Sequence, residues 1–278
     1  MSAVLGIDLR GDSICTASVG ETDGHAQILW LAQSPVSERM QFPDNVALSV
    51  AVPDHLVMVK NYLMRNGGGA DIDLRLQFEM EQSLLESPEL FQFDNVRTGL
   101  TDRYLGMIYR KERLASLINE LGIAQPEGST RYLARAAALG RGYKSFCRLS
   151  GGELQGVIDL TSTEASLCLL YRGEVTMLGH LKLDSYDLSS EVSLKRLAME
   201  IKTIVSFKLS SLAEMGLSLP LSNLAVAGEM PDLFIEQMLR YFPSGVSRVE
   251  INRAFLADPV DTTQRPELFL PALGLAVI

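Results

Sequence analysis

The sequence contains few cysteines, and their spacing forms no metal or disulfide pattern. There are three, Cys15, Cys147 and Cys168, and they match neither a zinc motif nor a disulfide framework. Cys15 and Cys168 fall within expected strands, where cysteine behaves as a small apolar residue. A chain without a disulfide framework is typical of a reducing compartment.

Long apolar runs and basic runs are also absent. No apolar run approaches the ~20 residues that span a bilayer, and no basic segment followed by an apolar stretch opens the chain. The net charge is −9 and no basic stripe is present, which argues against binding to nucleic acid. These absences predict a cytoplasmic protein without a membrane span. Its 278 residues, 47% of them hydrophobic, suffice for one large domain or two ordinary ones.

The sequence does contain an internal repeat. Gly6–Gly11 and Gly156–Thr161 both read as an apolar strand that ends in an aspartate, Asp8 or Asp159, and runs into a polar turn and a second strand. A repeat on this scale predicts two halves of similar build. Two such turns facing each other leave room for a polyphosphate and its metal.

The first half begins as a β-meander with turns at Gly11-Asp12 and Asp23-Gly24. Its expected strands are Ala3–Asp8, Ser13–Val19, Ala26–Leu31 and Val46–Ala51. Residues 57–124 then read as an inserted β-α-β-α unit. Its parts are a strand at Val57–Leu63, a helix at Asp71–Glu86, a strand at Tyr104–Tyr109 and an amphipathic helix that ends at Gly122. An Ala-rich helix over Arg131–Phe146 returns the chain to the first half.

The second half restarts after a candidate linker, Ser150-Gly151-Gly152. Its expected strands are Leu154–Asp159, Glu164–Tyr171, Glu174–Leu181, Asn223–Ala227 and Val246–Glu250, and its expected helices are Ser189–Met215 and a helix from Pro231 to Phe242. The apolar tail Leu270–Ala276 is expected to pack into the core. The chain thus divides into lobes at 1–149 and 150–278. This order of elements is that of the actin-like nucleotidase fold, an α/β fold with a duplicated ribonuclease-H-type domain.

Within that fold the order of motifs resembles one family. The segments Gln77–Gln82, Tyr104–Tyr109, Leu117–Ile123, Leu133–Leu139 and Ala272–Ala276 follow one another as in PilM, the actin-like assembly family of type IV pili, and more distantly as in FtsA. The resemblance implies ATP with Mg²⁺ between the two lobes. It also implies a PilN-like inner-membrane partner, whose short peptide is held near the inserted subdomain at the cytoplasmic face of the membrane.

The resemblance also implies a set of nucleotide-binding positions. They are Asp8, Gly11, Asp159, Thr161, Ser162, Thr163 and Gly228, with Asp8 and Asp159 as outer-shell metal ligands. The alternative interpretation of the two aspartates is that they cap strand ends or form turns. For Gly228 the alternative is a plain turn after a strand. His25, His55 and His180 show no metal spacing and are assigned no chemistry.

The chain departs from the family pattern at these positions. Arg10 and Asp12 stand in the first turn, where small residues with free amides bind phosphate. Arg10 either attracts a phosphate or points to solvent. The second turn lacks the family's glycine, and the turn after Ala227 has only Gly228. Leu181 also leads almost directly to the long helix, so the segment that closes over the nucleotide in the family is missing. A shallow, open site buries too little ligand surface for tight binding.

The sequence therefore predicts a non-catalytic scaffold of a type IV pilus or related secretion-type assembly, with a degenerate nucleotide cleft and no bound cofactor. The alternative is a functional Mg-ATP-binding PilM-like ATPase, and a weaker third is a small-metabolite kinase. Self-association is compatible with the fold. We expect Val57–Leu63 to be either an exposed strand that accepts an extended peptide by β-augmentation or an ordinary internal strand.

Overall fold

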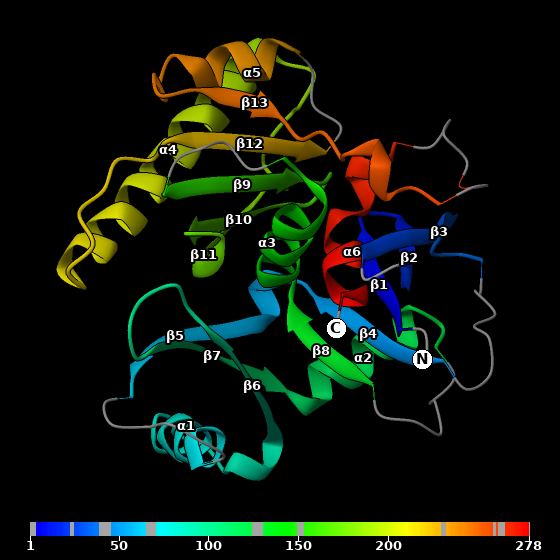
Figure 1. The fold of residues 1–278 in the computed structure, drawn as a ribbon, viewed down its shortest axis with the longest axis vertical. Coiled ribbons are helices and arrows are strands. Elements are labelled where there is room, and N and C mark those ends of the chain that lie inside the picture. Colours follow the sequence, from blue (N-terminus) through cyan, green and yellow to red (C-terminus); the bar gives the residue numbers. More distant parts are fainter. Residues whose placement is uncertain are drawn as a thin grey trace.

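Two five-stranded sheets and one three-stranded sheet form the frame of the molecule (Figure 1). A computed structural model describes residues 4–22, 25–38, 46–64, 71–123, 130–148, 153–228, 232–257, 260 and 265–277. The expected linker at 150–152, the expected lobe boundary and Pro231 lie outside the described residues.

The first sheet has the order β3-β2-β1-β4-β8. Its strands are β1 (Val4–Arg10), β2 (Ser13–Thr22), β3 (His25–Pro35), β4 (Ala47–Val52) and β8 (Arg131–Ala134). The first three form the expected antiparallel meander, and β4 and β8 add to it in parallel. The α/β fold class predicted from the sequence is confirmed.

The second sheet repeats this order as β11-β10-β9-β12-β13. Its strands are β9 (Leu154–Leu160), β10 (Glu164–Tyr171), β11 (Glu174–Lys182), β12 (Asn223–Gly228) and β13 (Val246–Arg248). The helices α4 (Glu191–Glu214) and α5 (Asp232–Leu239) pack on it around a separate apolar cluster. The two sheets therefore carry the same meander followed by two parallel strands.

Two helices lie between the sheets and join the lobes. The helix α6 (Leu270–Ala276) packs against the first sheet, and α3 (Arg135–Phe146) packs against both α6 and the second sheet. A Cβ atom at Gly142 would overlap the carbonyl of Leu270, and one at Gly274 would overlap the carbonyl of Ala138. The helix backbones therefore touch, and one continuous apolar core spans both lobes. The apolar tail is buried, as expected.

The inserted subdomain is a three-stranded sheet with two helices. Its elements are β5 (Val57–Leu63), α1 (Asp71–Gln82), β6 (Phe91–Arg97), β7 (Arg103–Arg110) and α2 (Lys111–Glu120), with the strand order β5-β7-β6. The predicted β-α-β-α order is wrong because it omits β6. This strand contains Gln92, Asp94 and Asn95 and is mostly half-buried, so it lacks the apolar pattern that predicts a strand. It is a strand because it pairs with β7.

The expected helix over Arg131–Phe146 begins four residues later than predicted. Residues 131–134 pair in parallel with β4 as the edge strand β8, and the helix starts at Arg135. This change of start matters for the site, because it places Arg135 at the first position of α3, between the lobes.

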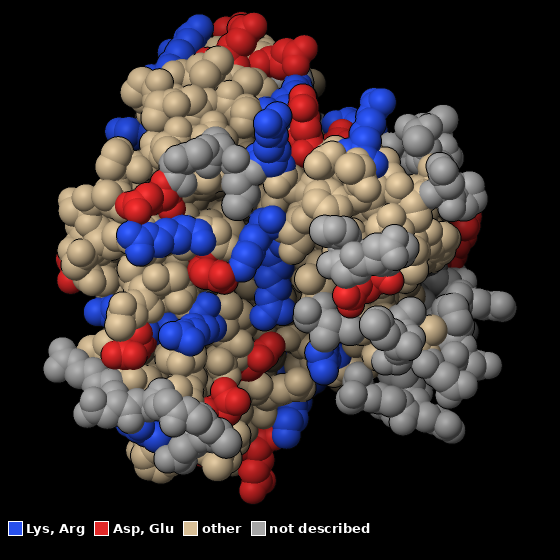
Figure 2. All heavy atoms as spheres, viewed as in Figure 1, with Lys and Arg blue, Asp and Glu red and all other residues tan. Residues whose placement is uncertain are grey.

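The remaining helical turns are short. They are the 3₁₀ helices at Asp54–Leu56, Pro88–Leu90, Arg253–Phe255 and Pro266–Phe269. Among the helices in the described ranges, none has both the length and the apolar character needed to cross a bilayer. On the face seen in Figure 2, Lys and Arg gather in a short column over α3, with Asp and Glu on either side of it.

Candidate functional site: a buried network of arginines and aspartates

The repeated aspartates Asp8 and Asp159 lie close together between the lobes. Asp8 is on β1 and Asp159 on β9, at equivalent places in the two sheets, and both side chains are fully buried. Asp8 pairs across its sheet with Cys15, and Asp159 pairs with Ser166. The internal repeat therefore brings two carboxyl groups into one buried space.

Arg135 connects the two aspartates. Its Nε donates to Oδ1 of Asp8 at 2.9 Å and its Nη2 donates to Oδ2 of Asp8 at 3.1 Å. The same Nη2 donates to Oδ2 of Asp159. Its Nη1 donates to Oγ of Ser166 at 3.0 Å. Arg135 is fully buried, so this side chain joins β1 of one lobe to β9 and β10 of the other.

Arg10 forms a second fork on Asp159. Its Nη1 donates to Oδ2 at 2.6 Å and its Nη2 donates to Oδ1 at 2.9 Å. Nη2 also donates to the carbonyl of Leu160 at 2.8 Å, and Nη1 reaches the carbonyl of Leu268 at 3.4 Å. The sequence suggested that Arg10 attracts a phosphate or points to solvent. In the structure it does neither and binds the aspartate of the opposite lobe.

The two carboxyl groups respond differently to this environment. Burial alone would raise the pKa of Asp159, but the charges of Arg10 and Arg135 outweigh it and lower the pKa below the usual value. Burial raises the pKa of Asp8, which one guanidinium contacts, despite the opposing effect of Arg135. Burial opposes the charge of Arg135 as well, but Asp8 and Asp159 together raise its pKa. Both guanidinium groups therefore remain protonated.

As arranged, these residues do not fit a magnesium–triphosphate group. Every carboxylate oxygen of Asp8 and Asp159 accepts a hydrogen bond from a guanidinium. A carboxylate that acts as an outer-shell ligand accepts from metal-bound water, whereas here each oxygen already has a guanidinium donor and Oδ2 of Asp159 has two. A bound metal ion would place its positive charge beside the aspartates. The guanidinium groups of Arg10 and Arg135 already lie there.

The two turns expected to hold phosphate contact each other. Gly11 has a φ of +60°, and a Cβ atom there would overlap Oγ of Ser162. Oγ1 of Thr161 accepts from the amides of Thr163 and Glu164, at 3.2 and 3.0 Å. It is thus engaged within its own turn. The hydroxyl of Thr163 lies 3.3 Å from that of Thr161.

Gly228 lies beside the arginine–aspartate network, at the end of β12. Its φ is +96°, and a Cβ atom there would overlap the carbonyl of Leu160 and lie 3.0 Å from Nη2 of Arg10. The glycine is therefore required by the close approach of Arg10 and Leu160. All seven expected nucleotide-binding residues thus lie around one junction, and Arg10 and Arg135 fill its centre.

Arg135 was not identified as a site residue from the sequence. A signal was present, because Arg135 is a lone charged residue in the apolar segment Leu133–Leu139. A charge at such a position is almost never fully buried unless it is paired. Its partners lie 127 and 24 residues away, so only the fold identifies them.

Two cavities border the inserted subdomain. The first has a volume of about 510 Å³ and is lined in part by Val57 and Val59 of β5. The second has a volume of about 390 Å³ and lies between β6 and β8, with Gln92 and Arg131 among its lining residues. β5 and β6 are the two edge strands of their sheet, so β5 is not an internal strand.

Comparison with known proteins identifies the fold. No protein-family model and no curated protein sequence matches the chain. Among solved structures, the chain is similar to a PilM–PilN type IV pilus biogenesis complex, with 14% identity, 98% of this chain and 97% of that chain covered, and a TM-score of 0.62. A Bacteroides thetaiotaomicron protein with an actin-like ATPase fold and unknown function matches with 9% identity, 97% and 95% coverage and a TM-score of 0.52.

A third similar structure is the cytoplasmic domain of EpsL, an inner-membrane component of the type II secretion system of Vibrio cholerae. It has 10% identity, 100% and 96% coverage and a TM-score of 0.50. These similarities, together with the repeated sheets, show that the protein has the actin-like ATPase fold.

Proposed function

We propose that this protein is a non-catalytic scaffold of a type IV pilus or related secretion-type assembly. The observation that carries the proposal is the network of Arg10, Arg135, Asp8 and Asp159. In this proposal the two arginines supply the positive charge that a metal ion would otherwise place beside the aspartates. They also hold the two lobes in one relative position, so that the cleft no longer opens for a nucleotide.

The similarity to the PilM–PilN complex and to the EpsL cytoplasmic domain supports the choice of system. We propose that the protein lies at the cytoplasmic face of the inner membrane through a PilN-like partner. A short peptide of that partner would bind beside the inserted subdomain. In the described part of the chain β5 and β6 are the edge strands of their sheet, and an edge strand can accept an extended peptide by β-augmentation. The edge of β5 is the predicted position, and the edge of β6 is the competing one.

The test is a calorimetric titration of the protein with the cytoplasmic N-terminal peptide of each bitopic membrane protein that neighbouring genes are found to encode. Two matched variants, Val59→Arg on β5 and Gln92→Arg on β6, place the same long side chain in each cavity. If β5 is the acceptor strand, Val59→Arg weakens binding at least tenfold and Gln92→Arg leaves it unchanged. The reverse pattern moves the site to β6. An absence of binding to any such peptide contradicts the scaffold role.

A functional Mg-ATP-binding protein is the second candidate. It is favoured by the placement of both repeated aspartates and Gly228 around one junction between the lobes. This function requires Arg10 and Arg135 to leave the aspartates when the nucleotide enters. Because both are bound on two sides in a buried space, that rearrangement would be costly.

A further inference from the structure

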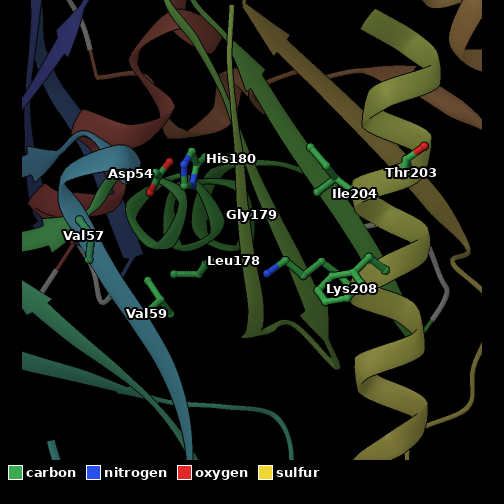
Figure 3. A pocket seen from close by; sticks show the side chains of 10 residues that line it. Asp54, Val57, Val59, Leu178, Gly179, His180, Thr203, Ile204 and Lys208 are labelled. Carbon is green, nitrogen blue, oxygen red and sulfur yellow. The ribbon is translucent and has the colours of Figure 1, made fainter. Parts of the chain in front are cut away.

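The cavity of about 510 Å³ lies between β5, β11 and α4, outside the arginine–aspartate network (Figure 3). Its walls are mostly apolar. Val57 and Val59 come from β5, Leu178 from β11, and Ile204 and Phe207 from α4. A volume of this size is in the range of small-ligand sites, which combine apolar walls with a few polar groups that orient the ligand.

One end of the cavity carries a carboxyl group, that of Asp54, which forms no ion pair with the described residues. Asp54 is only 5% exposed, and its Oδ1 accepts from the amide of Ala136 at 2.9 Å. Its Oδ2 is buried and has no hydrogen-bond partner at normal distance among the residues that the structure describes, although the Ser166 hydroxyl and the charge of Arg135 favour its ionised form. The neighbouring Glu164 adds negative charge and has its own partner, His55, at 3.3 Å. Burial lowers the pKa of His180, so its ring supplies no positive charge here.

Another part of the cavity carries an uncompensated amino group. The side chain of Lys208 extends from α4 toward Leu178, on the far side of the cavity from Asp54 and His180 (Figure 3). Lys208 has no ion pair within the described ranges, and burial lowers its pKa. A carboxyl group and an amino group thus line one largely apolar cavity, and no ion pair joins them in the described residues.

We propose that this cavity binds a ligand with a cationic nitrogen group at one end, a carboxylate at the other and an apolar stem between them. The cation would lie against Asp54, with Glu164 adding attraction, and the carboxylate would lie against Lys208. A buried charge without a partner is unfavourable, and such a ligand would pair both charges at once. The apolar stem would contact Val59, Leu178 and Ile204. The cavity borders β5, where the scaffold proposal places the partner peptide, so the peptide probes below separate the two proposals.

The test uses three probes of equal chain length: 8-aminooctanoate, octanoate and octylamine, each titrated by calorimetry at pH 8. The wild-type protein should bind 8-aminooctanoate at least tenfold more tightly than either singly charged probe. Asp54→Asn should remove the advantage over octanoate, because the amino group then has no counter-ion. Lys208→Met should remove the advantage over octylamine. Asp94→Asn, which alters an acid of the other cavity, should leave all three affinities unchanged.

The ligand's source is distinguished by a second pair of probes, the blocked peptides acetyl-Lys-Leu-Leu-Glu-amide and acetyl-Glu-Leu-Leu-Lys-amide. Binding of one peptide but not of 8-aminooctanoate assigns the ligand to a segment of a partner protein, and the reverse result assigns it to a free small molecule. Both results support the inference when they show the same dependence on Asp54 and Lys208. It is overturned if no probe binds, or if affinity is independent of the end groups.

Discussion

The replacement Arg135→Met tests the energetic role of the buried network. Methionine retains the length of the apolar stem but removes the donors to Asp8, Asp159 and Ser166. Asp8 loses the one guanidinium that contacts it among the described residues, and Asp159 retains Arg10. Removing one member of a buried ion pair typically costs about 3–5 kcal/mol, because it leaves an uncompensated buried charge. We expect a loss in this range in the free energy of unfolding, measured by urea titration at pH 7.

Lys144→Met is the matched control on the same helix. Lys144 forms an ion pair with Glu174 at 2.5 Å, but both side chains are about half exposed, at 44% and 52%. Exposed pairs contribute about 0–1 kcal/mol, so this variant should unfold at nearly the wild-type urea concentration. A loss below about 1 kcal/mol for Arg135→Met would refute the reasoning. Adding Asp8→Asn to Arg135→Met should recover part of the lost stability, because it removes the carboxyl group left without a guanidinium.

Three further outcomes follow from the same structure. Gly274→Ala brings a Cβ atom against the carbonyl of Ala138, so the free energy of unfolding should fall by about 1–3 kcal/mol. An unchanged free energy of unfolding would contradict the close contact between the helices. Burial raises the pKa of Asp54 to about 7 from its usual 3.8. Between about pH 4 and pH 7 the folded state therefore binds more protons than the unfolded state, so the free energy of unfolding should fall as the pH rises through this range. Asp54→Asn should reduce this dependence on pH. The lowered pKa of Asp159 acts in the opposite direction. Its ionised form stabilises the folded state at neutral pH, and this stabilisation should be lost as the pH falls below about 4. In urea titrations, Asp159→Asn should reduce this loss of stability at acid pH.

The architecture was accessible from the sequence because it depends on local patterns. The paired segments around Asp8 and Asp159, with turn residues between short apolar strands, predicted the repeated meanders that the two sheets contain. The amphipathic spacing before Gly122 predicted α2. Apolar periodicity and turn chemistry are properties of neighbouring residues, so a single sequence records them.

Features set by distant partners were not accessible in this way. The strand character of residues 131–134 comes from pairing with β4, and that of β6 comes from pairing with β7. The fork of Arg10 on Asp159 joins residues 149 positions apart. The sequence showed that Arg10 was an unusual residue for a phosphate-binding turn. It did not show that an aspartate of the opposite lobe neutralises it.

In the proposed function, Arg10 and Arg135 hold the cleft between the lobes in a form that does not accept a nucleotide. The most direct measurement is thermal unfolding of the wild-type protein over a titration with Mg-ATP up to several millimolar, with Mg-GTP and magnesium alone as references. A ligand present at 100 times its Kd stabilises a folded protein by about 2.7 kcal/mol. We predict no saturable rise in the unfolding temperature with Mg-ATP. A saturable rise specific to Mg-ATP, abolished by Asp159→Asn, would contradict the account.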